Sequence, residues 1–193
     1  TNDSKVVATE LREPYGLTVD LNGDLIIADK FHHRLCRLKN NKLEEIKVYD
    51  PDDHRRKAPR FRRNRPLSPA GIFCEDNGSL LVAYSNDHNI YRVHPSGKLE
   101  LVLGISPSKH YTFSNFNEHI PIEEVENTPI YMPAHVVAGK DGTIYFYDFM
   151  DRKKNRILKF NILYMNDKFE ILRRVSAEFA RWIGPNEMSL HAG

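Results

Sequence analysis

One pattern, repeated three times, constrains the fold of this 193-residue chain more than any other feature. Each copy opens with a proline, runs through β-branched and aromatic residues to an Asn-Gly or Asp-Gly pair, and enters a second such run. Two sets of residues share separations of 55 and 64 positions: the glycines Gly23, Gly78 and Gly142, and the prolines Pro14, Pro69 and Pro133. Such a period indicates a repeat architecture, in which each copy folds as a similar unit.

The pattern of each copy predicts four antiparallel strands. The Asx-Gly pairs supply the positive φ angles of tight turns between the first two strands. Third strands are predicted at 34–38, 89–93 and 155–160, and fourth strands at 45–49, 99–103 and 169–175. No amphipathic helix is predicted, and the best short candidate for a helix is Glu178–Trp182. Repeated four-stranded units predict an all-β chain built from β-propeller blades.

The alternation of apolar residues predicts a core between adjacent blades. Because each blade is covered on both faces, side chains of either parity can be buried. The expected buried residues are Leu17, Val19, Ile26, Ala28, Ile72, Leu81, Ala83, Val136, Tyr145 and Tyr147.

The three units resemble NHL repeats, in which Pro-x-Gly and Asp-x-x-Gly motifs precede an Asn-His-Arg-Ile-like signature. The first copy carries His33-Arg34-Leu35 and the second His88-Asn89-Ile90, whereas His135 replaces the usual glycine of the third. The resemblance implies one propeller segment with blades at about 12–50, 67–104 and 131–176 and a tail at 177–193. The long connection from Gly104 to Met132 resembles that of teneurin-like and bacterial NHL propellers, and it favours an extracellular or cell-surface setting.

Three blades are too few for a closed propeller, which has roughly four to eight. We expect the open apolar faces to be covered by blades of a longer chain or by a second copy that closes the ring. We favour the longer chain, because Lys5–Leu11 reads as the last strand of a preceding blade.

Two segments are candidates for binding. The formal net charge is only +2, but the 55–65 segment holds seven basic residues and no acidic one. Cations interleaved with an aromatic ring can contact phosphates and stack on bases, so single-stranded RNA and anionic polysaccharide are candidate partners. The candidate residues are Arg55, Arg56, Arg60, Phe61, Arg62 and Arg63 in this segment and Tyr111 and Phe113 in an aromatic loop.

Other polar residues favour structural roles. Asp20, Asp29 and Asp148 are expected to close turns by accepting backbone hydrogen bonds. Cys36 and Cys74 are expected to be buried or half-buried free thiols, with a disulfide as the less favoured alternative. No metal or cofactor is predicted. A related lyase, the peptidylglycine amidating enzyme, places a zinc-binding histidine directly after proline, and His135 comes one position later.

Three function classes remain. The first is a non-enzymatic scaffold that recognises a protein through propeller loops, because no catalytic motif accompanies the repeat. The second is a binder of RNA or another polyanion through the 55–65 segment. The third, ranked last, is a metal-dependent lyase-like propeller enzyme.

Overall fold

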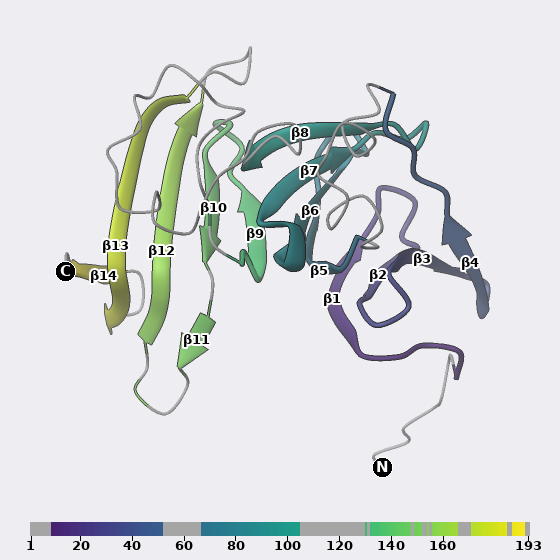
Figure 1. Ribbon diagram of the computed structural model, residues 1–193, viewed down its shortest axis with the longest axis horizontal. Helices are drawn as coiled ribbons and strands as arrows, with labels where there is room; N and C mark the ends of the chain where they lie inside the picture. The colour runs from purple at the N-terminus through teal and green to yellow at the C-terminus, as the bar shows by residue number, and fades with distance from the viewer. Residues whose placement is uncertain are drawn as a thin grey trace.

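A computed structural model describes residues 9–51, 67–104, 130, 132–147, 149–151, 154, 156–165, 171–184 and 187–191. Within these residues the chain forms three antiparallel sheets that follow one another in sequence and lie side by side (Figure 1). Apart from strands, the described residues contain one 3₁₀ turn, η1 (Ser85–Asp87). No helix in this part of the chain is long and apolar enough to cross a membrane.

The first two sheets are four-stranded meanders, in which each strand pairs with the next along the chain. The first contains β1 (Pro14–Val19), β2 (Leu25–Asp29), β3 (Arg34–Lys39) and β4 (Lys42–Ile46). The second contains β5 (Pro69–Cys74), β6 (Leu80–Tyr84), β7 (Asn89–Val93) and β8 (Leu99–Gly104). These sheets have the form of propeller blades, as the repeat predicts.

The third sheet is larger. It contains β9 (His135–Ala138), β10 (Ile144–Tyr147), β12 (Arg156–Met165), β13 (Ile171–Gly184) and β14 (Glu187–His191), and β11 (Phe149–Asp151) pairs with β12. Because β13 runs on to Gly184 and pairs with β14, this sheet continues past residue 176. The short helical candidate Glu178–Trp182 does not form a helix. These residues lie within β13, where Ala180 pairs with both β12 and β14 and is fully buried.

The predicted hairpin turns are confirmed. Gly23, Gly78 and Gly142 lie between the first and second strands of their sheets and have φ angles of +82°, +82° and +80°. Each glycine N–H donates to the carbonyl three positions earlier. The signature histidines also have a backbone reason to recur, since His33 and His88 both take the left-handed conformation, with φ of 57°, just before the third strand.

The core lies between blades. The first cluster joins Ile26, Ala28 and Leu35 of the first blade to residues of the second, among them Val82 and Tyr91. A second cluster joins the opposite face of the second blade to the third; its members include Leu81, Ala83, Ile90, Val136, Ile144 and Phe146. Burial of most of the predicted core residues is thereby confirmed.

Two predicted core residues are exposed. Leu17 and Val19 are 60% and 58% exposed, because they lie on the face of the first blade that points away from the second. Tyr145 and Tyr147 are only half-buried for a related reason, since they lie on the far face of the third blade. The errors fall on the two outer faces of the stack, where no described blade covers the side chains.

Candidate functional site

The innermost strands of the blades meet backbone to backbone, and two glycines permit it. A Cβ at Gly16 would lie 2.2 Å from the Ala70 carbonyl oxygen, and one at Gly71 would lie 2.4 Å from the His135 Cα. In β1 and β5 the strand register also shifts around these glycines. The register places His135 at the equivalent position of β9, where no shift occurs. The third blade therefore carries an imidazole ring where the others carry no side chain.

His135 belongs to a row of aromatic and basic side chains that links the first and third blades. We call this row the aromatic arc and define it as Arg12, Tyr15, Lys30, Phe31, His135 and Tyr147. The His135 ring stacks on Tyr147 with centroids 4.9 Å apart and lies 5.5 Å from the Tyr15 ring. Lys30 Nζ lies 4.6 Å from the Tyr15 centroid, and the Arg12 guanidinium lies 3.6 Å from the Phe31 centroid.

Buried polar groups hold the first-blade part of the arc in place. Asp29 is fully buried and accepts hydrogen bonds from the Arg12 backbone N–H at 2.8 Å and Arg34 Nε at 2.9 Å. His32 Nδ1 lies 2.8 Å from the same carboxylate. Burial alone raises the pKa of Asp29, but these bonds outweigh it and leave the pKa below its usual value. A charged Asp29 thus fixes the segment that presents Arg12 and Tyr15.

The electrostatics of the third-blade part are different. Burial lowers the pKa of His135, so its imidazole is neutral at neutral pH. A neutral ring can stack, accept a proton or donate a hydrogen bond, depending on its tautomer. His135 and Tyr147 also line a groove of about 470 Å³ on the far face of the third blade, where Tyr145, Ile162 and Trp182 contribute apolar walls.

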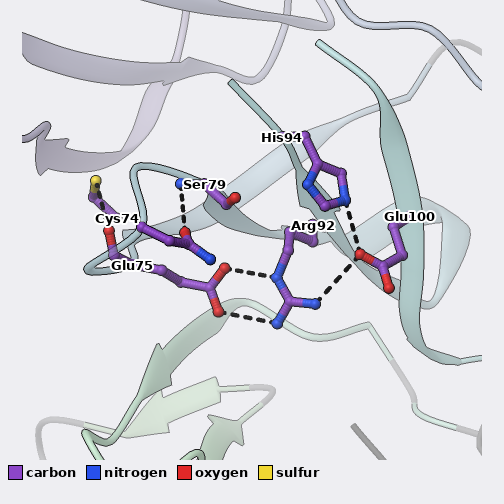
Figure 2. A network of polar contacts seen from close by, with 7 residues as sticks. Cys74, Glu75, Ser79, Arg92, His94 and Glu100 are labelled. Carbon is purple, nitrogen blue, oxygen red and sulfur yellow. Dashed lines mark hydrogen bonds and ion pairs between the residues drawn. The ribbon is translucent and has the colours of Figure 1, made fainter. Parts of the chain in front are cut away.

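A second polar cluster lies between the second and third blades. Arg92 is 2% exposed and binds Glu75 through two contacts, Nε to Oε2 at 2.6 Å and Nη2 to Oε1 at 3.0 Å (Figure 2). Glu100 completes the network by accepting from Arg92 at 3.4 Å and lying 2.8 Å from His94 Nε2. Figure 2 shows the guanidinium held between the two carboxylates, with each of its three nitrogens in contact with one of them.

This ion pair is part of the repeat. In the first blade Arg37 occupies the position of Arg92 in the strand register, and its Nε lies 3.2 Å from Asp20. The pair joins the first hairpin turn to the third strand in both blades. In the third blade the same positions hold Gly139 and Ile162, so that blade has apolar surface where the others have charge. We therefore interpret the Arg92 network as structural.

The structure tests some of the predicted site residues and not others. Arg55, Arg56, Arg60, Phe61, Arg62 and Arg63 lie outside the described residues, as do Tyr111, Phe113 and Asp148. The turn-closing role is confirmed for Asp20, which accepts from the N–H groups of Asn22 and Asp24. Asp29 also accepts a backbone hydrogen bond, but from Arg12 in a segment 17 positions away and not within a turn.

The expectation that both cysteines are free thiols is confirmed. Cys36 and Cys74 are free thiols, one buried and one half-buried, and burial raises the pKa of both. His88 makes a contact toward the next blade, since its Nδ1 accepts from the Met132 N–H at 3.1 Å. Among the described residues, no three His, Cys, Asp or Glu side chains come together in a way that could hold a metal ion.

Sequence reasoning did not find the aromatic arc. Its members come from four separate segments, and their neighbourhood depends on how three blades stack. One signal was present in the sequence: His135 breaks the Pro-x-Gly motif of the third copy. A side chain at the closest approach of two backbones has to point elsewhere, and here it points toward Tyr15 and Tyr147.

The fold and its relatives define the chain as a set of β-propeller blades. It is similar to a virginiamycin B lyase from Staphylococcus aureus (16% identity, TM-score 0.51, covering 93% of this chain and 55% of that one). A gluconolactonase from Xanthomonas campestris is also similar (11% identity, TM-score 0.55, covering 96% and 62%). At these identities the likeness concerns the fold alone, and the chain spans only 55% and 62% of the two structures. No family model and no curated protein match the sequence.

Proposed function

We propose that this chain is a non-enzymatic recognition segment of an NHL-type propeller, and that it binds a protein partner through the aromatic arc. The observation that carries the proposal is the series of ring contacts from Lys30 through Tyr15 and His135 to Tyr147, beside the Arg12–Phe31 pair, with Phe31 and Tyr15 44% and 46% exposed. The extracellular setting favoured by the long inter-blade connection belongs to the same proposal.

The residue types of the aromatic arc, and the contacts that restrict its rings, suit a binding surface. Tyr and Arg are the side chains that most often contribute large shares of protein–protein binding energy. Contacts with Lys30 and Arg12 restrict the Tyr15 and Phe31 rings before any partner arrives, which lowers the entropy lost on binding. Rings of this kind offer apolar area with few rotatable bonds.

The test is a contact map with a matched control. A photo-reactive phenylalanine analogue at Phe31 is expected to cross-link a partner from the native extracellular fluid, with the site identified by mass spectrometry. Tyr15→Ala should weaken binding of that purified partner by at least tenfold. Tyr164→Ala is the control, since Tyr164 is another half-exposed tyrosine, 5.5 Å from the Arg173 guanidinium, on β12. Equal loss in both variants, or none in Tyr15→Ala, would remove the arc from the interface.

One observation favours a second candidate, a lyase-like or lactonase-like enzyme. His135 is neutral, held by stacking, and lies beside an apolar groove, which suits a general base. Two proteins of similar fold are a virginiamycin B lyase and a gluconolactonase. This candidate predicts hydrolysis of gluconolactone that His135→Ala abolishes and Tyr164→Ala leaves intact. Identical rates with and without the protein would exclude that activity.

A further inference from the structure

The face of the third blade that turns toward the second blade is polar on its last two long strands, β12 and β13. The equivalent face of the second blade packs toward the first through apolar and aromatic side chains of β7 and β8, namely Tyr91, Val93, Leu99 and Leu101. The strand register gives their counterparts in β12 and β13, which are Asn161, Leu163, Arg174 and Ser176. Three of the four positions are therefore polar in the third blade, and only Leu163 keeps the buried, apolar character.

The three polar side chains bond to one another. Arg174 Nε lies 2.8 Å from Ser176 Oγ and 3.2 Å from Asn161 Oδ1, and Arg174 Nη2 donates to the same Oδ1 at 2.9 Å. Ser176 Oγ also donates to Asn161 Oδ1, at 2.8 Å. Asn161 is 7% exposed, so the buried amide oxygen is a fixed acceptor for one edge of the guanidinium. These contacts orient the Arg174 side chain, but both acceptors are neutral and leave its charge unbalanced.

The Arg174 charge has no counter-ion within the part of the chain that the structure describes. Its contacts there are those with Asn161 and Ser176, and neither N–H group of Nη1 takes part in them. The side chain is exposed enough for a ligand to reach it, yet partial burial of the guanidinium lowers the pKa of Arg174. An arginine stays charged in proteins, so this group is a partly desolvated cation without a carboxylate. An anion would offset the cost of that desolvation.

The strands around Arg174 are electropositive. Together β12 and β13 hold one acidic residue, Glu178, and five basic residues, which are Arg156, Lys159, Arg173, Arg174 and Arg181. The corresponding strands of the second blade, β7 and β8, hold one of each, Arg92 and Glu100. Clustered charge of one sign raises the local concentration of ions of the opposite sign. The surroundings of Arg174 therefore favour a negatively charged ligand.

We propose that Arg174 binds an oxyanion, the phosphate or carboxylate group of a small ligand, on the face of the third blade that turns toward the second. Asn161 and Ser176 hold the edge formed by Nε and Nη2, which leaves the edge formed by Nη1 and Nη2 for two oxygens of one ligand group. Such paired contacts are the arrangement in which arginine binds phosphates and carboxylates most specifically. The site is separate from the aromatic arc and does not depend on the arc binding a partner.

The first test observes the guanidinium itself in the wild-type chain. Inorganic phosphate and acetate are titrated separately, with chloride holding the ionic strength constant, and the Nε–Hε cross-peaks of the arginines are followed by NMR. The Arg174 cross-peak should shift and saturate, and the anion that saturates it at the lower concentration identifies the preferred group. Arg173 is the internal control, since it is the next residue, lies 5.5 Å from the Tyr164 ring and takes the opposite face of β13. No shift of Arg174, or equal shifts of both arginines, would overturn the proposal.

The second test uses a matched pair of variants. Arg174→Leu introduces the residue type that the second blade carries at Leu99, so the variant should fold, which circular dichroism checks. The preferred anion should raise Tm of the wild type and of Arg173→Leu, whereas Arg174→Leu should need at least about tenfold more anion for the same rise, since it loses a paired contact. Arg174→Lys keeps the charge without the planar fork and should give an intermediate response. A folded Arg174→Leu that responds like the wild type would show that the anion binds elsewhere and would end the proposal.

Discussion

The close approach of the innermost strands predicts that Gly71→Ala is costly. The new Cβ would lie 2.4 Å from the His135 Cα and 2.6 Å from the Ala134 carbonyl oxygen. Optimal separations between carbon atoms are about 3.5–4.0 Å, so β5 and β9 would have to separate by roughly 1 Å. Both neighbours are backbone atoms and cannot rotate away. We place the loss near the top of the usual overpacking range, about 3 kcal/mol.

Thermal unfolding followed by circular dichroism measures this loss. For a chain of this length about 1 kcal/mol shifts Tm by roughly 2–4 °C, so Gly71→Ala should lower Tm by about 6–12 °C. Gly184→Ala is the matched control. Its Cβ would meet Glu187 Cβ at 3.5 Å, an ordinary contact, and Tm should change by no more than about 2 °C. Similar Tm values for the two variants would refute the backbone-to-backbone packing of blades two and three.

Three further predictions follow from burial, linkage and charge. Ile26→Asp should unfold the chain under native conditions, because it strands an unpaired charge at a fully buried position, whereas Leu172→Asp should leave the circular dichroism spectrum unchanged. The pKa of Asp29 is lower in the folded protein than in the unfolded chain. The Asp29 carboxylate therefore stabilises the fold at pH values above its pKa in the unfolded chain, and this stabilisation is lost as the pH falls through its pKa in the folded protein. Urea unfolding should be measured at pH 6 and at pH 3, which span roughly the range where carboxylates titrate. The free energy of unfolding should fall less between these pH values in Asp29→Asn than in the wild type. If the 55–65 segment binds RNA or heparin, affinity should fall steeply from about 50 to 200 mM salt; a flat response in a filter-binding series would remove electrostatic binding.

The sequence was sufficient to predict the order of strands and turns within each blade. Asx-Gly turns and β-rich runs are local signals, so Gly23, Gly78 and Gly142 were placed correctly in hairpins. Strand ends were less accurate: the fourth strand of the first blade is Lys42–Ile46, whereas 45–49 was predicted. The Asn40-Asn41 turn, with φ of 50° and 62°, begins that strand earlier than the apolar pattern suggested.

The exposure of Leu17 could not be predicted from its own sequence context. Its neighbours follow the same alternation as those of Ile72, and the difference arises only from which blade lies beside it. The aromatic arc is hidden for the same reason, since Tyr15 and His135 are 120 positions apart and meet through the stacking of three blades. Local pattern fixes which face a side chain takes, and tertiary neighbours decide whether that face is covered.

The contact between Tyr15 and His135 is the most direct test of the account, because it requires the first and third blades to meet near a common axis. With ring centroids 5.5 Å apart, the two side chains should give nuclear Overhauser cross-peaks between their ring protons in a ¹³C-edited spectrum. The His135–Tyr147 pair, with centroids 4.9 Å apart within one blade, serves as the internal reference. Cross-peaks for both pairs are expected. A His135–Tyr147 cross-peak without any between Tyr15 and His135 would contradict the stacking of the three blades and the arc built on it.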